Sequence, residues 1–428
     1  MELMKHQIEA VEKAYEIMYS KNLVYIFGQP RVGKSLISLE LVDRLQKNTK
    51  LKKKAIVFTK KNAIKDWTKY TNYDFDVTNY EQVLNVVRDE YDYVIVDEAH
   101  NFSAFPRPSQ RMKDMRAFCM KKPIIFLSGT PFVEGPLKAY SQLGLSSWSP
   151  FKEFRNCYEF FKGFGIPNKV YMRGALIETY TKGDTEKIMS IINPYIVKVS
   201  YKDAGFDYQN EDKVIYIDGS DEYSLQMLAL YKGVAAEESD ENEWQDKGGQ
   251  DRIWYEIGGG KYYVLENISA SCQFLHRLCG GFYKDLNLPQ SKFKWLKDYV
   301  KTLKGKTAIM CYYLEEQENI AKHFENNKDI VVLSSTKYCE GIDLSDYNNY
   351  ILYSYGYSGS KFVQLRDRIV NLKKDRKTEV IIPLLTTTLF NQERDLMDNL
   401  IYESVKNKES FNTRTLGGLL DVAYHREV

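Results

Sequence analysis

The sequence predicts an α/β protein with two parallel-sheet lobes. Short apolar runs that alternate with helix-like segments are typical of strands buried in such sheets. Four runs lie in the first two hundred residues, at Tyr25–Phe27, Ala55–Phe58, Tyr93–Val96 and Ile124–Leu127. The pattern returns near the C-terminus, at Thr307–Met310, Ile330–Leu333, Tyr350–Tyr353 and Val380–Ile382. A length of 428 residues also favours two domains, because one domain typically takes roughly 100–200 residues.

The chain is expected to divide into three parts. Residues 1–200 form a first lobe with a helical extension, since the segment Phe151–Phe164 is rich in aromatic residues and follows the last core strand. Residues 201–285 carry weaker strand and helix signals, with an acidic stretch at Glu237–Glu243 and several adjacent glycines. We interpret them as a connecting region with a solvated loop, in preference to a functional element. Residues 286–428 form the second lobe.

Composition excludes several classes of protein. A hydrophobic fraction of 43% with 28% charged residues is typical of soluble globular proteins. No apolar run approaches the roughly 20 residues that cross a bilayer, and the N-terminus has no signal-peptide core, so we expect a cytoplasmic protein with no membrane contact. The six cysteines form no CxxC pair and predict neither a disulfide framework nor a zinc site. The net charge of +2 neither requires nor excludes nucleic acid as a partner.

A glycine-rich segment after the first strand carries the first chemical motif. Gly28-Gln29-Pro30-Arg31-Val32-Gly33-Lys34-Ser35 fits the pattern GxxxxGK followed by Ser or Thr, directly before a helix expected at Leu36–Leu45. The glycines let the backbone curl so that its N–H groups point at phosphates, and the helix start adds a positive dipole. Lys34 would reach the β- and γ-phosphates of ATP, and the Ser35 hydroxyl would bind Mg²⁺.

Two adjacent carboxylates form the second motif. The run Val94-Ile95-Val96-Asp97-Glu98-Ala99-His100 is an apolar strand that ends in Asp97 and Glu98. Asp97 would hold Mg²⁺ through water, and Glu98 would orient and deprotonate the water that attacks the γ-phosphate. The glycine-rich loop alone is also compatible with a kinase, a transporter ATPase or a GTPase, and the carboxylate pair argues against these classes.

These motifs resemble those of superfamily 2 helicases and translocases, in which the second motif reads DEAH or DEAD. Ser128-Gly129-Thr130-Pro131 is similar to the family's motif III, which couples the γ-phosphate to the nucleic-acid groove. Leu3-Met4-Lys5-His6-Gln7 is similar to its adenine-reading segment, with Gln7 as the amide that pairs with the base. The resemblance implies two RecA-like lobes in tandem, with ATP in the cleft between them.

Further segments resemble the Swi/Snf-like branch, over about residues 1–200 and 285–375. They are Ala55–Thr59 with Trp67, Thr78–Glu81, Gly135–Tyr140, Ser334–Leu344 of motif V and Gln364–Arg368 of motif VI. Two residues depart from this branch, because Asn371 stands where motif VI has a second arginine and Arg31 replaces the usual leucine of the glycine-rich loop. The departures weaken a placement among chromatin remodellers and favour a compact viral or bacterial member.

The resemblance implies a set of site residues in both lobes. Catalytic roles fall to Lys34, Glu98, Gln364 and Arg368, with Arg368 supplying positive charge to the transferring phosphoryl group. ATP contacts fall to Gln7, to Gly28, Gln29, Pro30, Arg31, Val32, Gly33, Lys34 and Ser35, to Asp97, and to Gly341 and Asp343. Coupling falls to Ser128, Gly129 and Thr130, and Mg²⁺ binding to Ser35 and Asp97.

Basic and hydroxyl side chains that follow the strands are candidates for gripping a phosphate backbone. Contacts of this kind provide affinity without sequence preference. The candidates are Thr59, Lys60, Lys61, Arg107, Arg111, Ser335, Thr336 and Lys337. For isolated lysines, a solvated surface is an equally good interpretation.

The sequence supports one leading hypothesis and three alternatives. The leading hypothesis is an ATP-dependent DNA translocase or helicase that moves on or remodels duplex or branched DNA, with replication or recombination proteins as candidate partners. An RNA helicase of the DEAH type uses similar motifs, and an ATP-switched nucleic-acid clamp with weak hydrolysis would explain Asn371. A P-loop ATPase unrelated to nucleic acid is the third alternative, and it leaves motifs V and VI unexplained. The sequence does not determine the oligomeric state.

Overall fold

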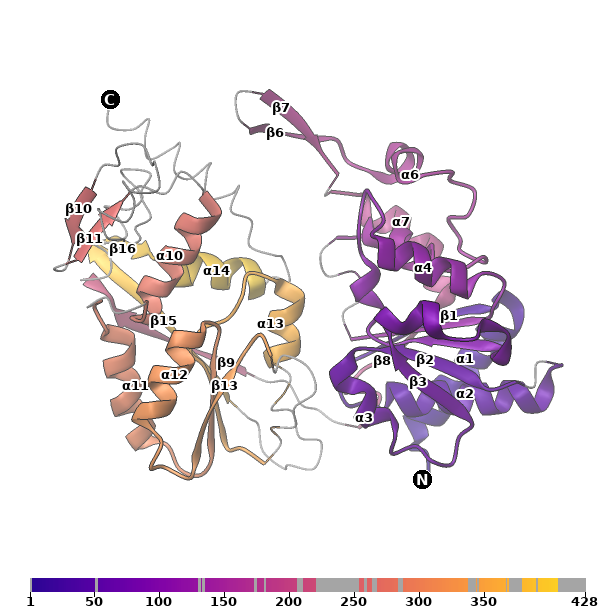
Figure 1. The fold of residues 1–428 in the computed structure, drawn as a ribbon, viewed down its shortest axis with the longest axis horizontal. Coiled ribbons are helices and arrows are strands. Elements are labelled where there is room, and N and C mark those ends of the chain that lie inside the picture. Colours follow the sequence, from indigo (N-terminus) through magenta and orange to yellow (C-terminus); the bar gives the residue numbers. More distant parts are fainter. Residues whose placement is uncertain are drawn as a thin grey trace. The chain divides into compact units, whose positions relative to one another are not determined.

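The computed structural model of the chain contains two compact α/β units, Met1–Tyr208 (unit 1) and Gln209–Val428 (unit 2), shown in Figure 1. Each unit is built on its own mainly parallel sheet, which confirms the predicted fold class of two parallel-sheet lobes. The structure describes residues 2–50, 53–129, 132, 135–172, 175–180, 182–205, 211–220, 254–257, 260–263, 268–283, 288–337, 344, 346–366, 368, 379–389 and 392–406.

Unit 1 has a six-stranded, entirely parallel sheet in the order β3-β2-β4-β5-β1-β8. The strands are β1 (Leu23–Gly28), β2 (Ala55–Thr59), β3 (Phe75–Asn79), β4 (Tyr93–Val96), β5 (Ile124–Ser128) and β8 (Ile196–Val199). The four predicted apolar runs are the four interior strands. Interior strands are covered on both faces and therefore read as continuous apolar runs, whereas the two edge strands are more exposed and mix polar with apolar residues.

Helices cover both faces of this sheet. They are α1 (Lys5–Lys21), α2 (Lys34–Asn48), α3 (Ile64–Trp67), α4 (Gln110–Cys119), α5 (Lys138–Leu143), α6 (Cys157–Phe164) and α7 (Thr185–Ile192). In Figure 1, α1 and α2 lie on one face of the sheet and α4 on the other. On the α4 side, Met115 and Phe118 pack against Phe58 and Phe126 of the strands.

The aromatic segment after β5, for which a helical extension was expected, contains the helix α6. Asn156 caps α6 by accepting a hydrogen bond from the backbone N of Glu159 at 3.0 Å. The ring centroid of Phe160 lies 4.9 Å from that of Phe151 and 4.8 Å from that of Phe164, within the same buried cluster as α4. The extension is therefore packed onto unit 1. Beyond it, β6 (Asn168–Met172) and β7 (Ala175–Thr179) form an antiparallel hairpin.

Unit 2 has a six-stranded sheet in the order β13-β12-β14-β15-β16, and β9 pairs with β15 as well. All pairs are parallel except β15 with β16. The strands are β9 (Glu211–Asp218), β12 (Thr307–Cys311), β13 (Ile330–Ser334), β14 (Asn349–Leu352), β15 (Glu379–Leu389) and β16 (Gln392–Asp395). A separate hairpin joins β10 (Trp254–Ile257) and β11 (Gly260–Tyr263).

Two groups of helices enclose the unit 2 sheet. They are α10 (Ile268–Gly280), α11 (Ser291–Thr302), α12 (Leu314–His323), α13 (Gly359–Arg366) and α14 (Met397–Lys406). Residues of α10, α13 and α14 share one buried cluster with the strands, and residues of α11 and α12 share another. Among the described residues, no helix combines the length and the apolar character that a membrane span requires.

The structure divides the chain into two units, whereas the sequence predicted a separate connecting region at residues 201–285. Unit 1 ends at Tyr208, and β9 pairs with β15 over eight residues in parallel register. Leu275 and Leu278 of α10 belong to the main buried cluster of unit 2. The described parts of this region are thus elements of the second lobe. The sequence does not reveal β9 clearly, because charged residues flank its short apolar run and its partner strand follows only after more than 150 intervening residues.

A buried ion pair joins three helices of unit 2. Lys292 Nζ lies 2.7 Å from Asp398 Oδ2, and His276 Nε2 lies 3.7 Å from the other carboxylate oxygen of Asp398. These residues stand on α11, α14 and α10, and all three side chains are buried. Because a buried charge is costly without its partner, the pair fixes how these helices pack against one another.

Replacing Lys292 by Met should lower the free energy of unfolding of unit 2 by about 3–5 kcal/mol, because Asp398 would remain buried without its counter-charge. Hydrogen exchange of the peptide that covers α11, followed in increasing urea, measures this loss. The matched control Lys301→Met removes the same charge from an exposed pair with Asp298 on the same helix and should leave unfolding unchanged. Equal shifts for both variants would contradict a structural role for the buried pair.

Candidate nucleotide-binding site

The segment Gly28–Ser35 is a curled loop between β1 and α2. Its start is tied to the end of β8, because Gln29 N donates to Val199 O at 3.0 Å. A Cβ added to Gly28 would lie 2.8 Å from side-chain carbons of both Val32 and Lys34, so the curl leaves no room for a side chain. Gly33 is the N-cap of α2, which places Ser35 in the first turn, where unpaired backbone N–H groups face the loop.

Gly33 is required for a second reason, its contact with Gln7. Its φ of +89° lies in the left-handed region, and a Cβ there would be 2.2 Å from Gln7 Nε2. The buried Gln7 amide donates to Val32 O at 3.3 Å and accepts from Met4 N at 3.0 Å. Gln7 therefore supports the backbone of the loop from α1, and its contact with an adenine base stays a prediction.

Lys34 projects its amino group into the curl. Lys34 Nζ donates to Gly28 O at 2.7 Å and to Gln29 O at 3.2 Å. Gly129 faces the same space, since a Cβ on it would be 3.8 Å from Lys34 Nζ. A triphosphate is bound by a cationic amine and by the backbone N–H groups of a loop and a helix N-terminus. This site offers all of these.

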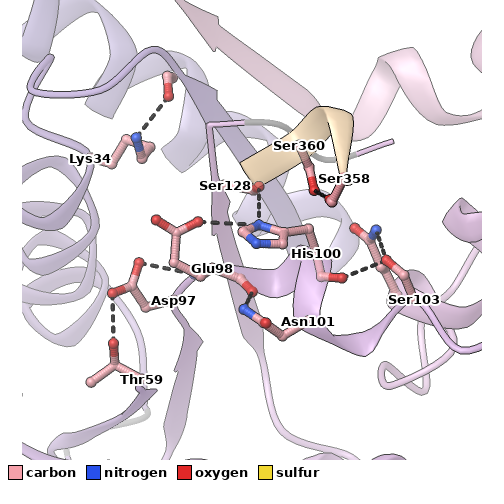
Figure 2. A network of polar contacts seen from close by, with 12 residues as sticks. Lys34, Thr59, Asp97, Glu98, His100, Asn101, Ser103, Ser128, Ser358 and Ser360 are labelled. Atoms are coloured by element: carbon pink, nitrogen blue, oxygen red, sulfur yellow. Dashed lines mark hydrogen bonds and ion pairs between the residues drawn. The ribbon is translucent and has the colours of Figure 1, made fainter. Parts of the chain in front are cut away.

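Asp97 and Glu98 stand at the end of β4, beside this loop (Figure 2). Asp97 Oδ2 accepts from Thr59 Oγ1 at 2.8 Å and from Trp67 Nε1 at 3.1 Å, and its Oδ1 accepts from Glu98 N at 3.0 Å. The Tyr80 hydroxyl donates to the backbone oxygen of Asp97. β2, α3 and the start of the 3₁₀ segment Tyr80–Asn85 thus hold one carboxylate in a fixed orientation.

Glu98 is turned away from Asp97 by an unusual backbone conformation. Its φ of 46° and ψ of 50° are left-handed, a conformation that costs free energy in a residue with a side chain and that is found preferentially at functional sites. The turn brings Glu98 Oε2 to 3.2 Å from His100 Nδ1. The two neighbouring carboxylates therefore have different partners, as Figure 2 shows.

The different partners give the two carboxyl groups different pKa values. Desolvation raises the pKa of Asp97, and the adjacent charge of Glu98 raises it further. Desolvation would also raise the pKa of Glu98, but contact with His100 and the charges of Lys34 and Lys60 outweigh it and lower that pKa. Of the pair, Glu98 is the group that ionises first, so its carboxylate carries the negative charge and can accept a hydrogen bond from a water molecule.

Ser35 and Asp97 are the residues that would hold Mg²⁺. Among the described residues, no group of three or more His, Cys, Asp or Glu side chains is arranged to hold a metal ion. Mg²⁺ usually keeps several water ligands and is bound through one or two protein oxygens together with substrate phosphates. A hydroxyl and a single carboxylate beside a phosphate-binding loop fit that requirement.

A chain of partly buried polar contacts links the carboxylates to β5 and α5. His100 Nδ1 also lies 3.1 Å from Ser128 Oγ. Ser103 Oγ donates to His100 O at 2.6 Å and accepts from Gln142 Nε2 at 2.7 Å. Gln142 Oε1 accepts from Tyr25 OH at 2.7 Å, and both of these side chains are fully buried. The segment after Glu98 is therefore held by residues from β1, β5 and α5.

An open groove on unit 1 collects three of the predicted nucleic-acid contacts. Lys60, Lys61 and Arg111 line a hollow of about 520 Å³ together with Asn79, Tyr80, Glu81 and Gln82. The Arg111 guanidinium lies over the rings of Tyr80 and Phe102, with centroids at 5.6 and 5.4 Å. Arg107 is exposed but does not line this hollow.

Two predicted nucleic-acid contacts need correction. Thr59 is fully buried and donates to Asp97, so its hydroxyl supports the carboxylate and cannot reach a phosphate backbone. Ser335 of unit 2 is also buried, with 5% of its surface exposed. Its neighbours Thr336 and Lys337 are exposed at the end of β13, and the Thr336 hydroxyl lies 2.8 Å from Ser334 Oγ.

The remaining predicted site residues are distributed as follows. Gln364 is buried on α13, and Arg368 is partly exposed shortly after that helix. Arg366, which lies between these two residues in the motif VI segment, is ion-paired with Asp212 of β9 at 2.6 Å. Thr130, Gly341, Asp343 and Asn371 lie outside the described residues.

A parallel α/β unit with a phosphate-binding loop after β1 and a carboxylate pair after β4 defines a P-loop nucleotide-binding unit. The sequence model of the RNA helicase family matches residues 24–128, which span both motifs, so this part of unit 1 is similar to that family. Among solved structures, the chain is similar to the Sulfolobus solfataricus SWI2/SNF2 ATPase core in complex with dsDNA, at 15% identity and a TM-score of 0.42. That likeness covers 99% of this chain and 96% of the other. A comparison with curated proteins gave no match.

Several site residues were not identified from the sequence. Trp67 and Tyr80 appeared only as parts of resembling segments, and His100, Ser103 and Gln142 had no assigned role. A single serine, histidine or glutamine carries no local pattern that distinguishes a buried contact from a surface residue. Their roles depend on strand order, which brings the ends of β1, β4 and β5 together.

A double-mutant cycle on Tyr25→Phe and Gln142→Leu should show positive coupling. Each single change leaves a buried polar partner unsatisfied and should cost about 1–3 kcal/mol of unfolding free energy, whereas removing both partners should cost less than the sum. Thermal or urea unfolding of the four proteins measures the cycle. The exposed control Gln110→Leu should fall within about 0.5 kcal/mol of wild type. Strict additivity of the two buried changes would contradict the contact.

Proposed function

We propose that this protein is a nucleic-acid-dependent ATPase that translocates on duplex or branched DNA. The observation that carries the proposal is the placement of Thr59 and Lys60 at the end of β2. The Thr59 hydroxyl holds Asp97 of the nucleotide site, and the next residue, Lys60, lines the basic groove. Lys60 also contributes to the lowered pKa of Glu98. The end of β2 therefore supports the carboxylates proposed for hydrolysis and also lines the groove proposed to bind phosphates.

The hydrolytic step falls to Glu98. Mg²⁺ would supply charge neutralisation for the phosphates, held by Ser35 and Asp97. Lys34 would bind the terminal phosphates, and the ionised Glu98 carboxylate would orient a water and accept its proton. His100 positions Glu98 and touches Ser128, so movement of β5 relative to β4 would change the orientation of the base.

We further propose that Arg368 of unit 2 completes the site when nucleotide is bound. A guanidinium placed against the transferring phosphoryl group stabilises the charge of the transition state. Lys34 from one unit and Arg368 from the other would then favour a closed arrangement that hydrolysis releases. Alternate gripping by two units converts that cycle into movement along a strand.

A second candidate function is an RNA helicase, which the family match over residues 24–128 favours. The Swi/Snf-like segments favour DNA instead. A groove that binds phosphates alone accepts both, while recognition of the 2′-hydroxyl would appear as a preference for RNA. ATP turnover measured with single-stranded, duplex and forked DNA, and with RNA of the same sequence in competition, decides between them. If none of these nucleic acids stimulates turnover, both candidates fail.

Glu98→Gln should lower single-turnover ATP hydrolysis by about 10²–10⁴-fold while leaving nucleotide binding in place, because the amide cannot accept the proton of the attacking water. Arg368→Ala should behave in the same way. Rapid-quench hydrolysis and equilibrium binding of a fluorescent ATP analogue measure the two properties separately. The matched control Glu90→Gln changes an exposed carboxylate of unit 1 and should be as active as wild type. A Glu98→Gln rate equal to that of wild type would remove Glu98 from the chemistry.

Lys60→Ala combined with Lys61→Ala should weaken binding to all DNA sequences alike and reduce the slope of log affinity against log salt by about 2, one for each lost phosphate contact. Fluorescence anisotropy with a labelled duplex over a salt series gives this slope. Lys5→Ala combined with Lys13→Ala, which removes two exposed lysines of α1, is the control and should keep the wild-type slope. Identical slopes for the two double variants would show that the groove does not hold DNA.

A further inference from the structure

Unit 1 contains a second hollow, which we call the α4–α5 pocket. Its volume is about 510 Å³, and it is lined by α4, α5, the segment before α4 and the segment from Gly144 to Cys157. It shares no lining residue with the groove around Lys60 and none with the phosphate-binding loop or the carboxylates. The proposed ATPase mechanism gives this pocket no role.

The charged side chains that line the pocket have one sign. Arg116, Lys121, Lys152 and Arg155 line it, and no Asp or Glu side chain is among the lining residues. All four basic side chains are exposed, and none of them is ion-paired with a carboxylate in the part of the chain that the structure describes. Four cations around one hollow repel each other, so an anion in the pocket would relieve that repulsion.

Serine hydroxyls in the pocket add hydrogen-bond donors. Ser146 Oγ accepts from Trp148 N at 3.1 Å, Ser147 Oγ from Lys121 N at 2.9 Å, and Ser149 Oγ from Phe151 N at 3.2 Å. A hydroxyl that accepts a hydrogen bond from the backbone keeps its own proton for another acceptor. Ser146 and Ser149 are more than nine-tenths buried, and Ser147 is exposed. These donors, like the four cations, favour an anion.

The rest of the wall is apolar and partly aromatic. Pro106, Pro108 and Met120 line it, and so do the partly exposed rings of Tyr140 and Phe154. Met120 is 52% exposed, which is high for a large apolar side chain. Bases of single strands stack on aromatic and apolar surfaces while their phosphates contact cations. A nucleotide of a nucleic acid offers both a base for the apolar wall and a phosphate for the cations.

α4 connects the pocket with the groove. Arg111 near the start of the helix lines the groove, and Arg116 lines the pocket. Five residues of helix rise by about 7.5 Å along the helix axis, a distance that neighbouring nucleotides of one strand can span. The two arginines lie about 140° apart around the axis of α4, so a nucleic-acid strand that contacts both passes around the helix.

We propose that the α4–α5 pocket binds one nucleotide of the nucleic acid that the groove around Lys60 holds. Arg116 and Lys152 contact its phosphate, and the wall that contains Phe154 contacts its base. The inference rests on the proposed function and extends its substrate site. A strand held at two places on one unit remains bound while the other unit releases it. An acidic protein segment is the competing occupant, and the experiment separates the two.

Cys157 provides a native reporter inside the pocket. It is a partly exposed free thiol that lines the hollow, whereas Cys119, Cys272, Cys279 and Cys311 are buried. The full-length protein is alkylated with a maleimide, and modification of the Cys157 peptide is followed by mass spectrometry. A single-stranded oligonucleotide, the matching duplex and poly-glutamate are the added probes. The proposal expects the single strand or the duplex to slow modification of Cys157 several-fold and poly-glutamate to have little effect.

Charge reversal gives the second measurement. Arg116→Glu with Lys152→Glu should reduce the salt slope of DNA binding by about 2 and abolish the protection of Cys157. Lys162→Glu with Lys182→Glu, two exposed lysines of unit 1 outside the pocket, changes the net charge equally and should do neither.

The outcomes separate the pocket from the proposed function. DNA that binds without slowing Cys157 modification overturns the pocket assignment and leaves the groove intact. Protection by poly-glutamate alone assigns the pocket to an acidic protein segment and also overturns the proposal. Absence of DNA binding by the wild type would remove the proposed function itself, and the pocket assignment with it.

Discussion

Two carboxylates side by side at the end of a buried strand form the constraint on which the rest of unit 1 depends. Placing two negative charges in the interior is costly unless each has hydrogen bonds or a counter-charge. The protein provides these separately. Thr59 and Trp67 donate to Asp97, and His100 contacts Glu98. The positions of β2, α3 and the segment after β4 follow from this division.

The left-handed backbone at Glu98 is what makes the division possible. With an extended backbone, two consecutive side chains of a strand point to opposite faces, and only one would face the phosphate-binding loop. The turn at Glu98 directs its side chain toward His100, where the positive charge of Lys34 also acts on it. Asp97 keeps its contacts with β2 and α3. The hydrogen bonds that run through Ser103, Gln142 and Tyr25 hold the segment that follows this strained turn. The orientation of Glu98 therefore depends on how the residues around its turn pack.

The glycine-rich loop is constrained from its other side by α1. Gln7 occupies the space that a side chain at position 33 would need and binds the loop carbonyl of Val32. A segment that resembles an adenine-reading element thus also defines the curl of the phosphate loop. A base contact and a loop contact by the same amide would couple recognition of the base to the shape of the phosphate site.

The sequence by itself determined the fold class, the four interior strands of unit 1, and the loop and carboxylate motifs, because each of these is a local pattern of apolar runs or fixed spacing. Tertiary structure alone decided that Thr59 supports Asp97, that Ser335 is buried and that β9 joins the second sheet. Only the tertiary structure also brought Arg116, Lys152 and the serines around one pocket. The physical reason is that a hydroxyl or a lysine has no local signature of its environment, which depends on which strand ends and helices meet after the chain has folded.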